Sequence, residues 1–203
     1  MASSGNWFDQ AYHGIPPWDI GRPQPGIVRL AERGEIRGRV LDIGCGTGEN
    51  TLFLAGRGLE VMGIDAAPTA IGKARAKAKE RGITARFEVA DALNLPAAAD
   101  PFDSVIDMGL FHVFPDEARE AYRESLARVL RPSGTYFMMC FSDRQPGDWG
   151  PRRITQTEIR STFAEGWRIN YIQPTELEMT EGRAFGWLAS IAREPASAIR
   201  KRL

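Results

Sequence analysis

Short apolar segments typical of buried strands alternate with segments of helical periodicity between residues 39 and 141. The predicted strands are 39–43, 59–64, 85–89, 102–108 and 135–141, and the predicted helices among them are 49–57, 69–81 and 116–130. Strands joined through helices run parallel, and right-handed connections place the helices on both faces of the sheet. The sequence therefore predicts an α/β fold built on a doubly wound, mostly parallel sheet.

The two ends of the chain depart from this alternation. The first 26 residues are rich in Pro, Gly and aromatic side chains, which predicts an irregular arm that covers part of the domain. Thr155 and Glu158 have the spacing of a capping box that starts a helix. Further helices are predicted at 26–34 and 156–164, and two antiparallel edge strands at 167–172 and 185–193. We expect one domain over residues 1–203, made of the arm (1–26), a core (36–141) and a final part (142–203).

Charge and composition argue against several kinds of partner. The 203 residues include 26 basic and 26 acidic side chains, which is not the positive excess of a dedicated nucleic-acid-binding protein. No apolar stretch reaches the roughly 18 residues of a membrane span, and no signal-peptide pattern is visible. Cys45 and Cys140 lie in apolar segments without metal-ligand spacing. We expect a cytoplasmic monomer or weak homodimer with buried thiols, without metal, nucleic acid or membrane.

A glycine-rich loop, Asp42-Ile-Gly-Cys-Gly-Thr-Gly48, connects the first predicted strand to its helix. In open α/β sheets the ligand crevice lies at the carboxyl ends of the strands, so this loop faces the expected ligand. The loop lacks the Lys of a P-loop, and Glu49 and Thr51 stand where a dinucleotide-binding fingerprint needs its third glycine. Glu49 would also repel a pyrophosphate at the helix N-terminus. The pattern predicts a ligand without phosphate groups.

Acidic residues lie at the ends of three predicted strands. Asp65 follows Gly44 by 21 positions and ends the second strand, where a carboxylate accepts hydrogen bonds from ribose hydroxyls. Asp91 follows the third strand, where it can accept from an adenine amino group, and Asp42 in the first strand can pair with an ammonium group. The three carboxylates predict a nucleoside that carries an amino acid. The alternative is that Asp65 or Asp91 only caps the next helix.

The segments DIGCGTG, GID and VADA resemble the successive motifs of class I S-adenosylmethionine (SAM) methyltransferases. FDSVIDMGLFHVF and LARVLRPSGTYFM resemble that family's fourth strand, next helix and fifth strand, so the resemblance covers about residues 36–141. It implies a Rossmann-like, seven-stranded fold, SAM as cofactor and S-adenosylhomocysteine (SAH) as product. The implied cofactor-binding residues are Gly44, Gly46 and Gly48 at the methionine end, Asp42, Asp65 with Ala66 at the ribose, Asp91 with Ala92 at the adenine, and Asp107 with Met108 at the amino-acid portion.

The arm sequence Pro16-Pro-Trp-Asp-Ile-Gly-Arg-Pro-Gln-Pro25 resembles the arm of halide, thiol and thiopurine methyltransferases. It departs from the plant-type arm at Gln24, where that family has Thr. The resemblance implies that the arm closes over the cofactor as a lid and that Trp18 contacts it. A Trp face attracts a sulfonium cation, and a lid excludes water from the transfer. The alternatives are that Trp18 only fastens the arm to the core and that Asp19 and Arg22 only pair with each other.

Residues near the ends of the fourth and fifth strands are candidates for the acceptor side. His112 can act as a general base or orient the acceptor, and its alternative role is to support the pocket wall. Aromatic and polar side chains at these strand ends suit a flat, small, apolar acceptor. The candidate acceptor-binding residues are Tyr12, His13, Phe111, Trp149 and Arg152.

These features together predict a SAM-dependent methyltransferase. Methyl transfer is an in-line displacement with a neutral leaving group, so the enzyme mainly has to align the reacting atoms. We expect the acceptor to be the O, S or N atom of a small aromatic or thiol compound. Two alternatives remain: an RNA or protein methyltransferase, for which the chain shows no appended module, and a SAM-binding module without catalysis.

Overall fold

The computed structural model describes residues 4–195, and these form an α/β domain around a seven-stranded sheet. The strand order is β3–β2–β1–β4–β5–β7–β6. The strands are β1 (Arg39–Ile43), β2 (Glu60–Asp65), β3 (Arg86–Val89), β4 (Phe102–Met108), β5 (Leu130–Phe141), β6 (Trp167–Glu178) and β7 (Arg183–Arg193). β1 to β5 are parallel, while β7 pairs antiparallel with both β5 and β6. This confirms the predicted doubly wound sheet and its antiparallel edge.

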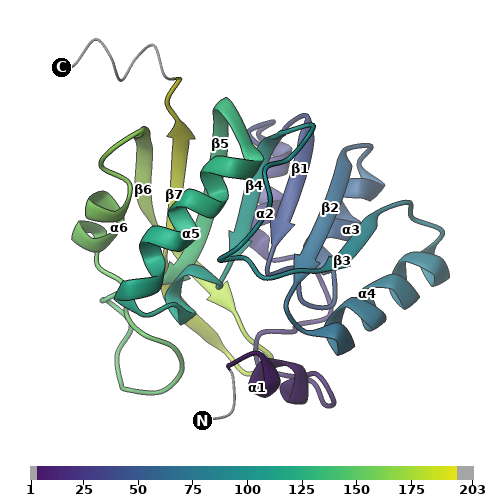
Figure 1. The fold of residues 1–203 in the computed structure, drawn as a ribbon. Helices are drawn as coiled ribbons and strands as arrows, with labels where there is room; N and C mark the ends of the chain where they lie inside the picture. Colours follow the sequence, from purple (N-terminus) through teal and green to yellow (C-terminus); the bar gives the residue numbers. More distant parts are fainter. Residues whose placement is uncertain (1–3, 196–203) are drawn as a thin grey trace.

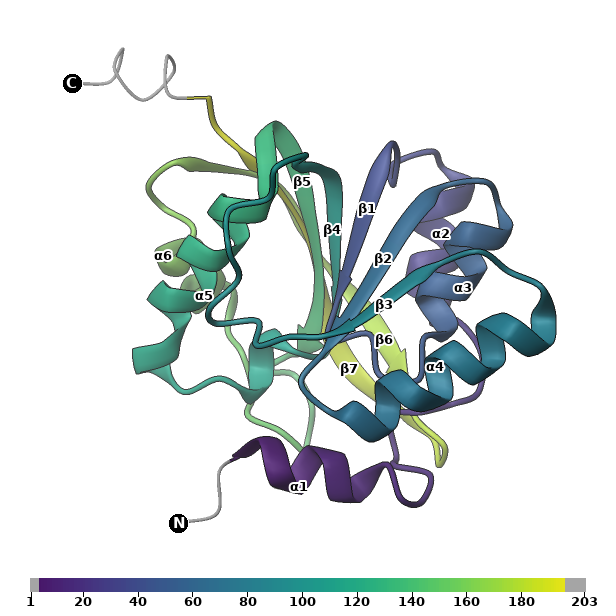
Figure 2. The same cartoon turned by 45° about the vertical axis from the view of Figure 1, so that its right-hand side comes forward.

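Most of the helices form two layers, one on each face of the sheet (Figures 1 and 2). They are α1 (Ser4–Ala11), α2 (Pro25–Glu32), α3 (Glu49–Gly56), α4 (Pro68–Arg81), the short 3₁₀ helix η1 (Phe111–Val113), α5 (Asp116–Val129) and α6 (Gln156–Thr162). α2, α3 and α4 cover one face, and α5 and α6 cover the other. No helix within residues 4–195 is long and apolar enough to cross a membrane.

Alternation along the strands explains why both faces carry helices. In β1, Val40 packs with α2 and α3, whereas Leu41 and Ile43 pack with α5, and all three are buried. Successive strand side chains point to opposite faces, so a continuous apolar run is what a sheet covered on both faces requires. The strand order reverses between β1 and β4, and this switch point places the crevice at the carboxyl ends of those strands.

Several element bounds differ from the sequence prediction. The arm is not irregular throughout, because residues 4–11 form α1 below the carboxyl ends of the parallel strands (Figure 1). A helix this short is marginal alone, and tertiary contacts support it: the Asp9 carboxylate accepts the Thr69 N–H of α4 at 2.8 Å. β5 begins at Leu130 rather than at 135, since Leu130 is fully buried beside Phe102 of β4. β6 continues to Glu178 because β7 pairs along its whole length.

Candidate functional site

The glycine loop, residues 44–48, turns sharply at the carboxyl end of β1. The N–H groups of Gly44 and Cys45 donate to the Ile64 carbonyl at 2.8 and 2.9 Å, which ties the loop to β2. Gly46 has a φ of 54°, and a Cβ there would lie 2.7 Å from the Tyr12 hydroxyl of the arm. Gly48 has a φ of 85°, and a Cβ there would lie 2.8 Å from the Phe87 ring. Gly46 therefore admits the arm, and Gly48 permits packing against β3.

Asp42 is fully buried, and only one of its two carboxylate oxygens accepts a hydrogen bond from the described residues. Its Oδ2 accepts the Thr51 hydroxyl at 2.6 Å, but its Oδ1 has no hydrogen-bond partner among the described residues. Burial raises the pKa of Asp42 to about 7, against the opposing hydrogen bond from Thr51. A buried carboxylate oxygen without a donor is costly, and a bound ammonium group would satisfy it.

Asp65 ends β2 directly beside the glycine loop. Its two oxygens accept the N–H groups of Gly46 and Ala67, each at 2.9 Å. Burial raises the pKa of Asp65. An ionised carboxylate has about four acceptor positions, so these bonds leave capacity for a ribose hydroxyl. Ala66, which follows Asp65, is exposed, so a ligand can reach the backbone at this turn.

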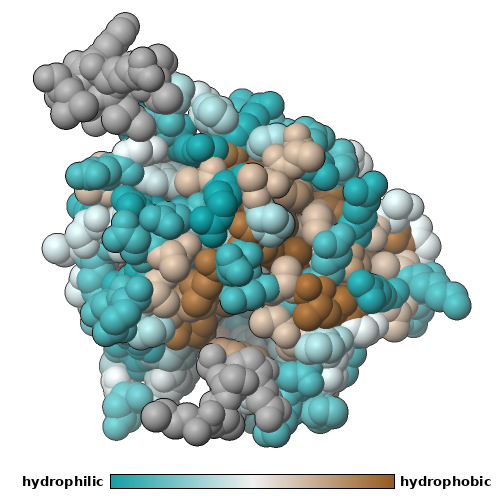
Figure 3. Space-filling view, in the orientation of Figure 1, coloured by the Kyte–Doolittle hydropathy of each residue, from teal (hydrophilic) through white to brown (hydrophobic). Residues whose placement is uncertain are grey.

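The segment after β3 combines a polar side chain with an exposed apolar one. Asp91 accepts the Leu93 N–H at 2.9 Å, which closes a turn, and residues 91–101 contain no helix for it to cap. Val89 is 51% exposed, although it ends a strand, and Ala92 is half-buried. Apolar side chains gather on this face between α5 and α4 (Figure 3). An adenine ring can cover Val89 while its amino group donates to Asp91.

Asp107 at the end of β4 corrects a prediction. Its Oδ2 accepts the hydroxyls of Tyr122 and Tyr136, both at 2.7 Å, and its Oδ1 accepts the N–H groups of Leu110 and Phe111 at 2.7 and 3.4 Å. Burial raises the pKa of Asp107 to about 6. Because the protein supplies all four donors, this carboxylate orders the turn after β4 and has no acceptor position left for a cofactor. Its neighbour Met108 is half-buried and packs toward α2.

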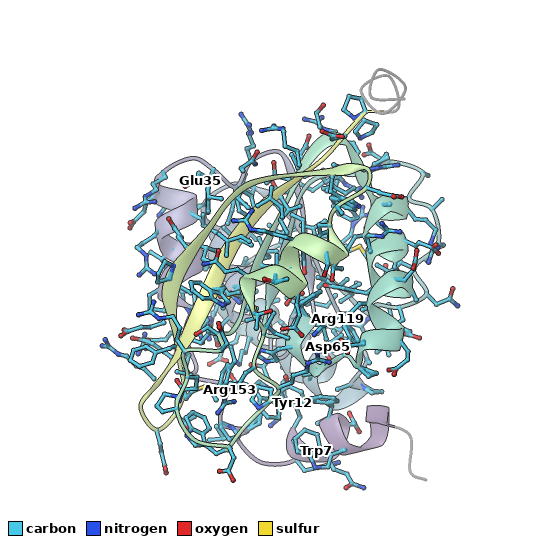
Figure 4. The ribbon with its side chains drawn as sticks, turned by 90° about the vertical axis from the view of Figure 1, so that its left-hand side faces the viewer. Trp7, Tyr12, Glu35, Asp65, Arg119 and Arg153 are labelled. Atoms are coloured by element: carbon cyan, nitrogen blue, oxygen red, sulfur yellow. The ribbon has the colours of Figure 1, made fainter. Side chains whose placement is uncertain are left out.

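Tyr12 and Trp18 bring the arm onto the glycine loop. Tyr12 is 4% exposed, and its hydroxyl accepts the Trp18 indole N–H at 2.9 Å. Trp18 packs with Ala67 and Ala70 at the start of α4, so it does fasten the arm to the core. Figure 4 shows Trp7, Tyr12 and Asp65 in sequence from the lower end of the molecule toward its middle. The arm therefore covers the crevice at the point where the loop and Asp65 meet.

The rest of the arm is held by two other partners. The Thr47 hydroxyl of the glycine loop donates to the Asp19 carboxylate at 2.9 Å, and Arg22 pairs with Glu178 of β6 at 2.5 Å. Asp19 and Arg22 thus do not form the local pair that the sequence left open. The Gln24 amide donates to the Glu178 carbonyl at 2.8 Å and accepts its N–H at 3.0 Å. Gln24, where the arm departs from the plant pattern, joins the arm to β6.

His112 is buried in η1 and hydrogen-bonded to the backbone. The Phe141 N–H donates to its Nδ1 at 2.9 Å, so the neutral ring carries its proton on Nε2. Burial, together with the nearby Arg153, lowers the pKa of His112 to about 3. The Nε2 edge lies against Gly109. These features argue against a general base and leave His112 as a hydrogen-bond donor or a support of the pocket wall.

The other acceptor-side candidates are dispersed. Phe111 is fully buried in the core against Tyr122 and Phe163, which corrects its prediction as an acceptor contact. Arg152 pairs with Asp116 at 2.9 Å and with Glu158 at 2.5 Å, and its role at the acceptor stays a prediction. His13 is exposed at the end of α1, and Trp149 is 47% exposed on the loop 142–155.

Arg153, one of the polar side chains that the sequence places near the ends of the fourth and fifth strands, organises the loop 142–155. Its guanidinium donates to four backbone carbonyls, at 2.6 Å for Pro151 and 2.8 Å for Trp149, and at 3.2 Å for Gln145 and Gly147. It also lies over the rings of Phe141 and Trp149. An arginine in a polar loop gives no sequence signal that separates it from a solvated one.

Comparison with known proteins shows the class of this chain. Residues 40–134 match the family model described as a methyltransferase domain. The chain is 41% identical, over 84% of its length and 80% of the relative, to the 2-heptyl-1-hydroxyquinolin-4(1H)-one methyltransferase of Mycobacteroides abscessus. It is 28% identical, over 79% of its length and 72% of the relative, to the probable thiol methyltransferase 2 of Arabidopsis thaliana.

A solved structure agrees over nearly the whole chain. The structure described as "Conversion of a Disulfide Bond into a Thioacetal Group during Echinomycin Biosynthesis" superposes with a TM-score of 0.87 and 38% identity, covering 98% of this chain and 97% of the other. The chain belongs to the class I SAM-dependent methyltransferases, and its cofactor is SAM. The buried Oδ1 of Asp42 suits the SAM ammonium group, and Asp65 has acceptor positions for the ribose.

Proposed function

We propose that this methyltransferase methylates an oxygen or sulfur atom of a small, flat, apolar acceptor that ionises without an enzyme base. The observation that carries the proposal is the bonding of His112: its Nδ1 accepts the Phe141 N–H, and its pKa is lowered to about 3. A ring in this state cannot take a proton near neutral pH. The acceptor therefore has to present its own anion.

The chemistry needs little more than alignment and a dry crevice. SAM supplies a methyl group on a positively charged sulfur, which leaves as a neutral thioether. The acceptor loses its proton to solvent, its anion forms the new bond to the methyl carbon, and the carbon–sulfur bond breaks. Tyr12 and Trp18 of the arm exclude water from this step, and the His112 Nε2–H can hold the acceptor oxygen.

A hydroxyl on an aromatic heterocycle is the preferred acceptor class. The relative from Mycobacteroides abscessus is named for such a compound and shares 41% identity over 84% of this chain. The half-exposed Trp149, edge-on to Phe141 at 5.6 Å between ring centroids, offers a surface for a flat ring. A thiol is the second candidate, supported by the name of the Arabidopsis relative and by the free thiol pKa near 8.5.

Transfer from isotope-labelled SAM to a graded panel tests the proposal. The panel contains aromatic hydroxyl compounds of increasing pKa, thiols and nitrogen heterocycles, with RNA and protein as further arms, and mass spectrometry identifies the product. We expect the wild-type rate to follow the ionised fraction of each acceptor, and His112→Gln to keep that dependence. A loss of about 10²–10⁴-fold that is confined to weakly acidic hydroxyls in His112→Ala would restore the base role. Label in RNA or protein, or no transfer, would reject the small-molecule acceptor.

A further inference from the structure

A continuous chain of polar side chains links the arm to helix α4 through the glycine loop. Lys77 of α4 donates to the Thr47 hydroxyl oxygen at 2.7 Å, and that hydroxyl donates to both oxygens of Asp19, at 3.0 and 2.9 Å. Lys77 also donates to Glu49 at 2.7 Å, and Arg81 donates to both Glu49 oxygens at 2.8 Å. Neither Thr47 nor Lys77 belongs to the cofactor contacts considered above.

The hydroxyl group of Thr47 is held between two partners, Asp19 and Lys77. A threonine hydroxyl has one proton to donate, and here the proton goes to the arm while a lone pair accepts from Lys77. Thr47 is 4% exposed and Glu49 is 8% exposed, so water competes weakly for these bonds. Hydrogen bonds in such a chain polarise one another, and the positive Lys77 strengthens the bond from Thr47 to Asp19.

The charge balance also depends on the position of the arm. With the arm in place, the positive charges of Lys77 and Arg81 face the negative charges of Glu49 and Asp19. Burial would raise the pKa of Glu49, but the hydrogen bonds from Arg81 and Lys77 outweigh it and hold that pKa below its usual value, so Glu49 stays ionised. Withdrawal of the arm removes Asp19 and leaves Glu49 as the carboxylate that pairs with both Lys77 and Arg81. The resulting excess of positive charge favours the return of Asp19 to Thr47.

We propose that Thr47 and Lys77 are positioning residues that latch Asp19, and with it the arm, onto the cofactor-binding loop. Thr47 is part of the glycine loop that faces SAM, so the latch closes best when the bound cofactor holds that loop in place. The latch thereby couples retention of SAM to closure of the crevice. This inference rests on the SAM-dependent activity and is independent of the acceptor.

Matched lysines on one helix provide the test. Lys77→Met breaks the latch, while Lys79→Met makes the same chemical change at an exposed position of α4. Chymotrypsin reports arm closure, because the arm holds aromatic cleavage sites at Trp7, Phe8, Tyr12 and Trp18. With saturating SAH, we expect the arm of Lys77→Met to be cut at least about tenfold faster than that of Lys79→Met. Its calorimetric dissociation constant for SAH should rise about 5–20-fold.

Two further measurements separate the latch from a general loss of stability. Thr47→Val should reproduce the effects of Lys77→Met, while Thr47→Ser and Lys77→Arg should restore slow cutting. Wild-type SAH affinity should weaken with added salt, and Lys77→Met should lose most of that dependence. Equal cutting and equal SAH affinity in Lys77→Met and Lys79→Met would overturn the proposal. So would a wild-type response in Thr47→Val, because Lys77 would then act only through Glu49. These binding readouts do not depend on whether any acceptor is methylated.

Discussion

Asp42 and Asp107 lie at the carboxyl ends of neighbouring strands, and both carboxylates are fully buried. Asp42 has one hydrogen-bond donor and an oxygen without a partner, whereas Asp107 has four donors from its own chain. The difference gives a criterion for a candidate cofactor contact: such a residue leaves bonding capacity unused in the described structure, whereas a structural residue does not. Sequence position alone gave both the same predicted role.

The largest effect is expected from removing the Asp107 carboxylate, which accepts four hydrogen bonds from its own chain. Asp107→Leu leaves the hydroxyls of Tyr122 and Tyr136 and two backbone N–H groups buried without an acceptor. The free energy of unfolding should fall by about 3–5 kcal/mol, measured by urea denaturation. Tyr136→Phe is the control, because it deletes only one donor and should cost about 1 kcal/mol. Comparable losses in the two variants would mean that Asp107 is not the organiser of this turn.

Asp65→Asn tests whether a carboxylate with unused acceptor positions binds the cofactor, as we also infer for Asp42. We expect the affinity for SAM to fall by about 1.5–3 kcal/mol, roughly 10–150-fold, because the charged acceptor of the ribose hydroxyls is lost. The amide can still accept one N–H from Gly46 or Ala67, so the protein should remain folded. Calorimetry with SAH measures the change. An unchanged dissociation constant would exclude Asp65 from ribose binding.

Asp42→Asn should weaken cofactor binding and stabilise the free protein at alkaline pH. The folded-state pKa of Asp42, about 7, lies above its usual value near 4. Between these pH values the folded state holds a proton that the unfolded state has released, so the stability of the free protein falls as pH rises through this window. Asp42→Asn removes this contribution and should add about 1–2 kcal/mol at pH 8.

The same variant, Asp42→Asn, should bind the cofactor more weakly even though it stabilises the free protein. The SAM ammonium group pairs with the ionised form of Asp42, so wild-type affinity should rise with pH up to about 7. Asp42→Asn should lose about tenfold in affinity together with this pH dependence. Melting temperatures and calorimetry from pH 5 to 8.5 measure both trends. A variant that binds SAH as the wild type does across this range would show that Oδ1 has another partner.

The smallest effect is expected at Arg152, which the sequence assigned to the acceptor. Its ion pairs with Asp116 and Glu158 are partly exposed, and such pairs contribute below about 1 kcal/mol. Arg152→Gln should therefore change neither KM for the acceptor nor kcat by more than about twofold. A selective rise in the acceptor KM would return Arg152 to the acceptor site.

The fold and the cofactor loop could be predicted because their signals are local. β1 carries apolar side chains on both faces because helices cover both faces of the sheet, although Asp42 interrupts the apolar run. Its predicted bounds, 39–43, are those observed. Gly46 and Gly48 occur where a side chain would collide with Tyr12 or Phe87. Helix α1 was missed because its stability comes from contacts with α4, sixty positions away, such as that between Asp9 and Thr69.

The sequence by itself determined the α/β class, the parallel core and the cofactor loop, because periodicity and glycine spacing express backbone requirements. The spacing of Thr155 and Glu158 also determined their capping box, but only the tertiary structure decided the state of the polar side chains around the crevice. It turned Asp107 and Phe111 inward, set the tautomer of His112 through the Phe141 N–H, and joined Asp19 to Thr47 across 28 positions. Hydrogen bonds and burial of this kind depend on which distant groups meet in space, and no local pattern in a single chain specifies that.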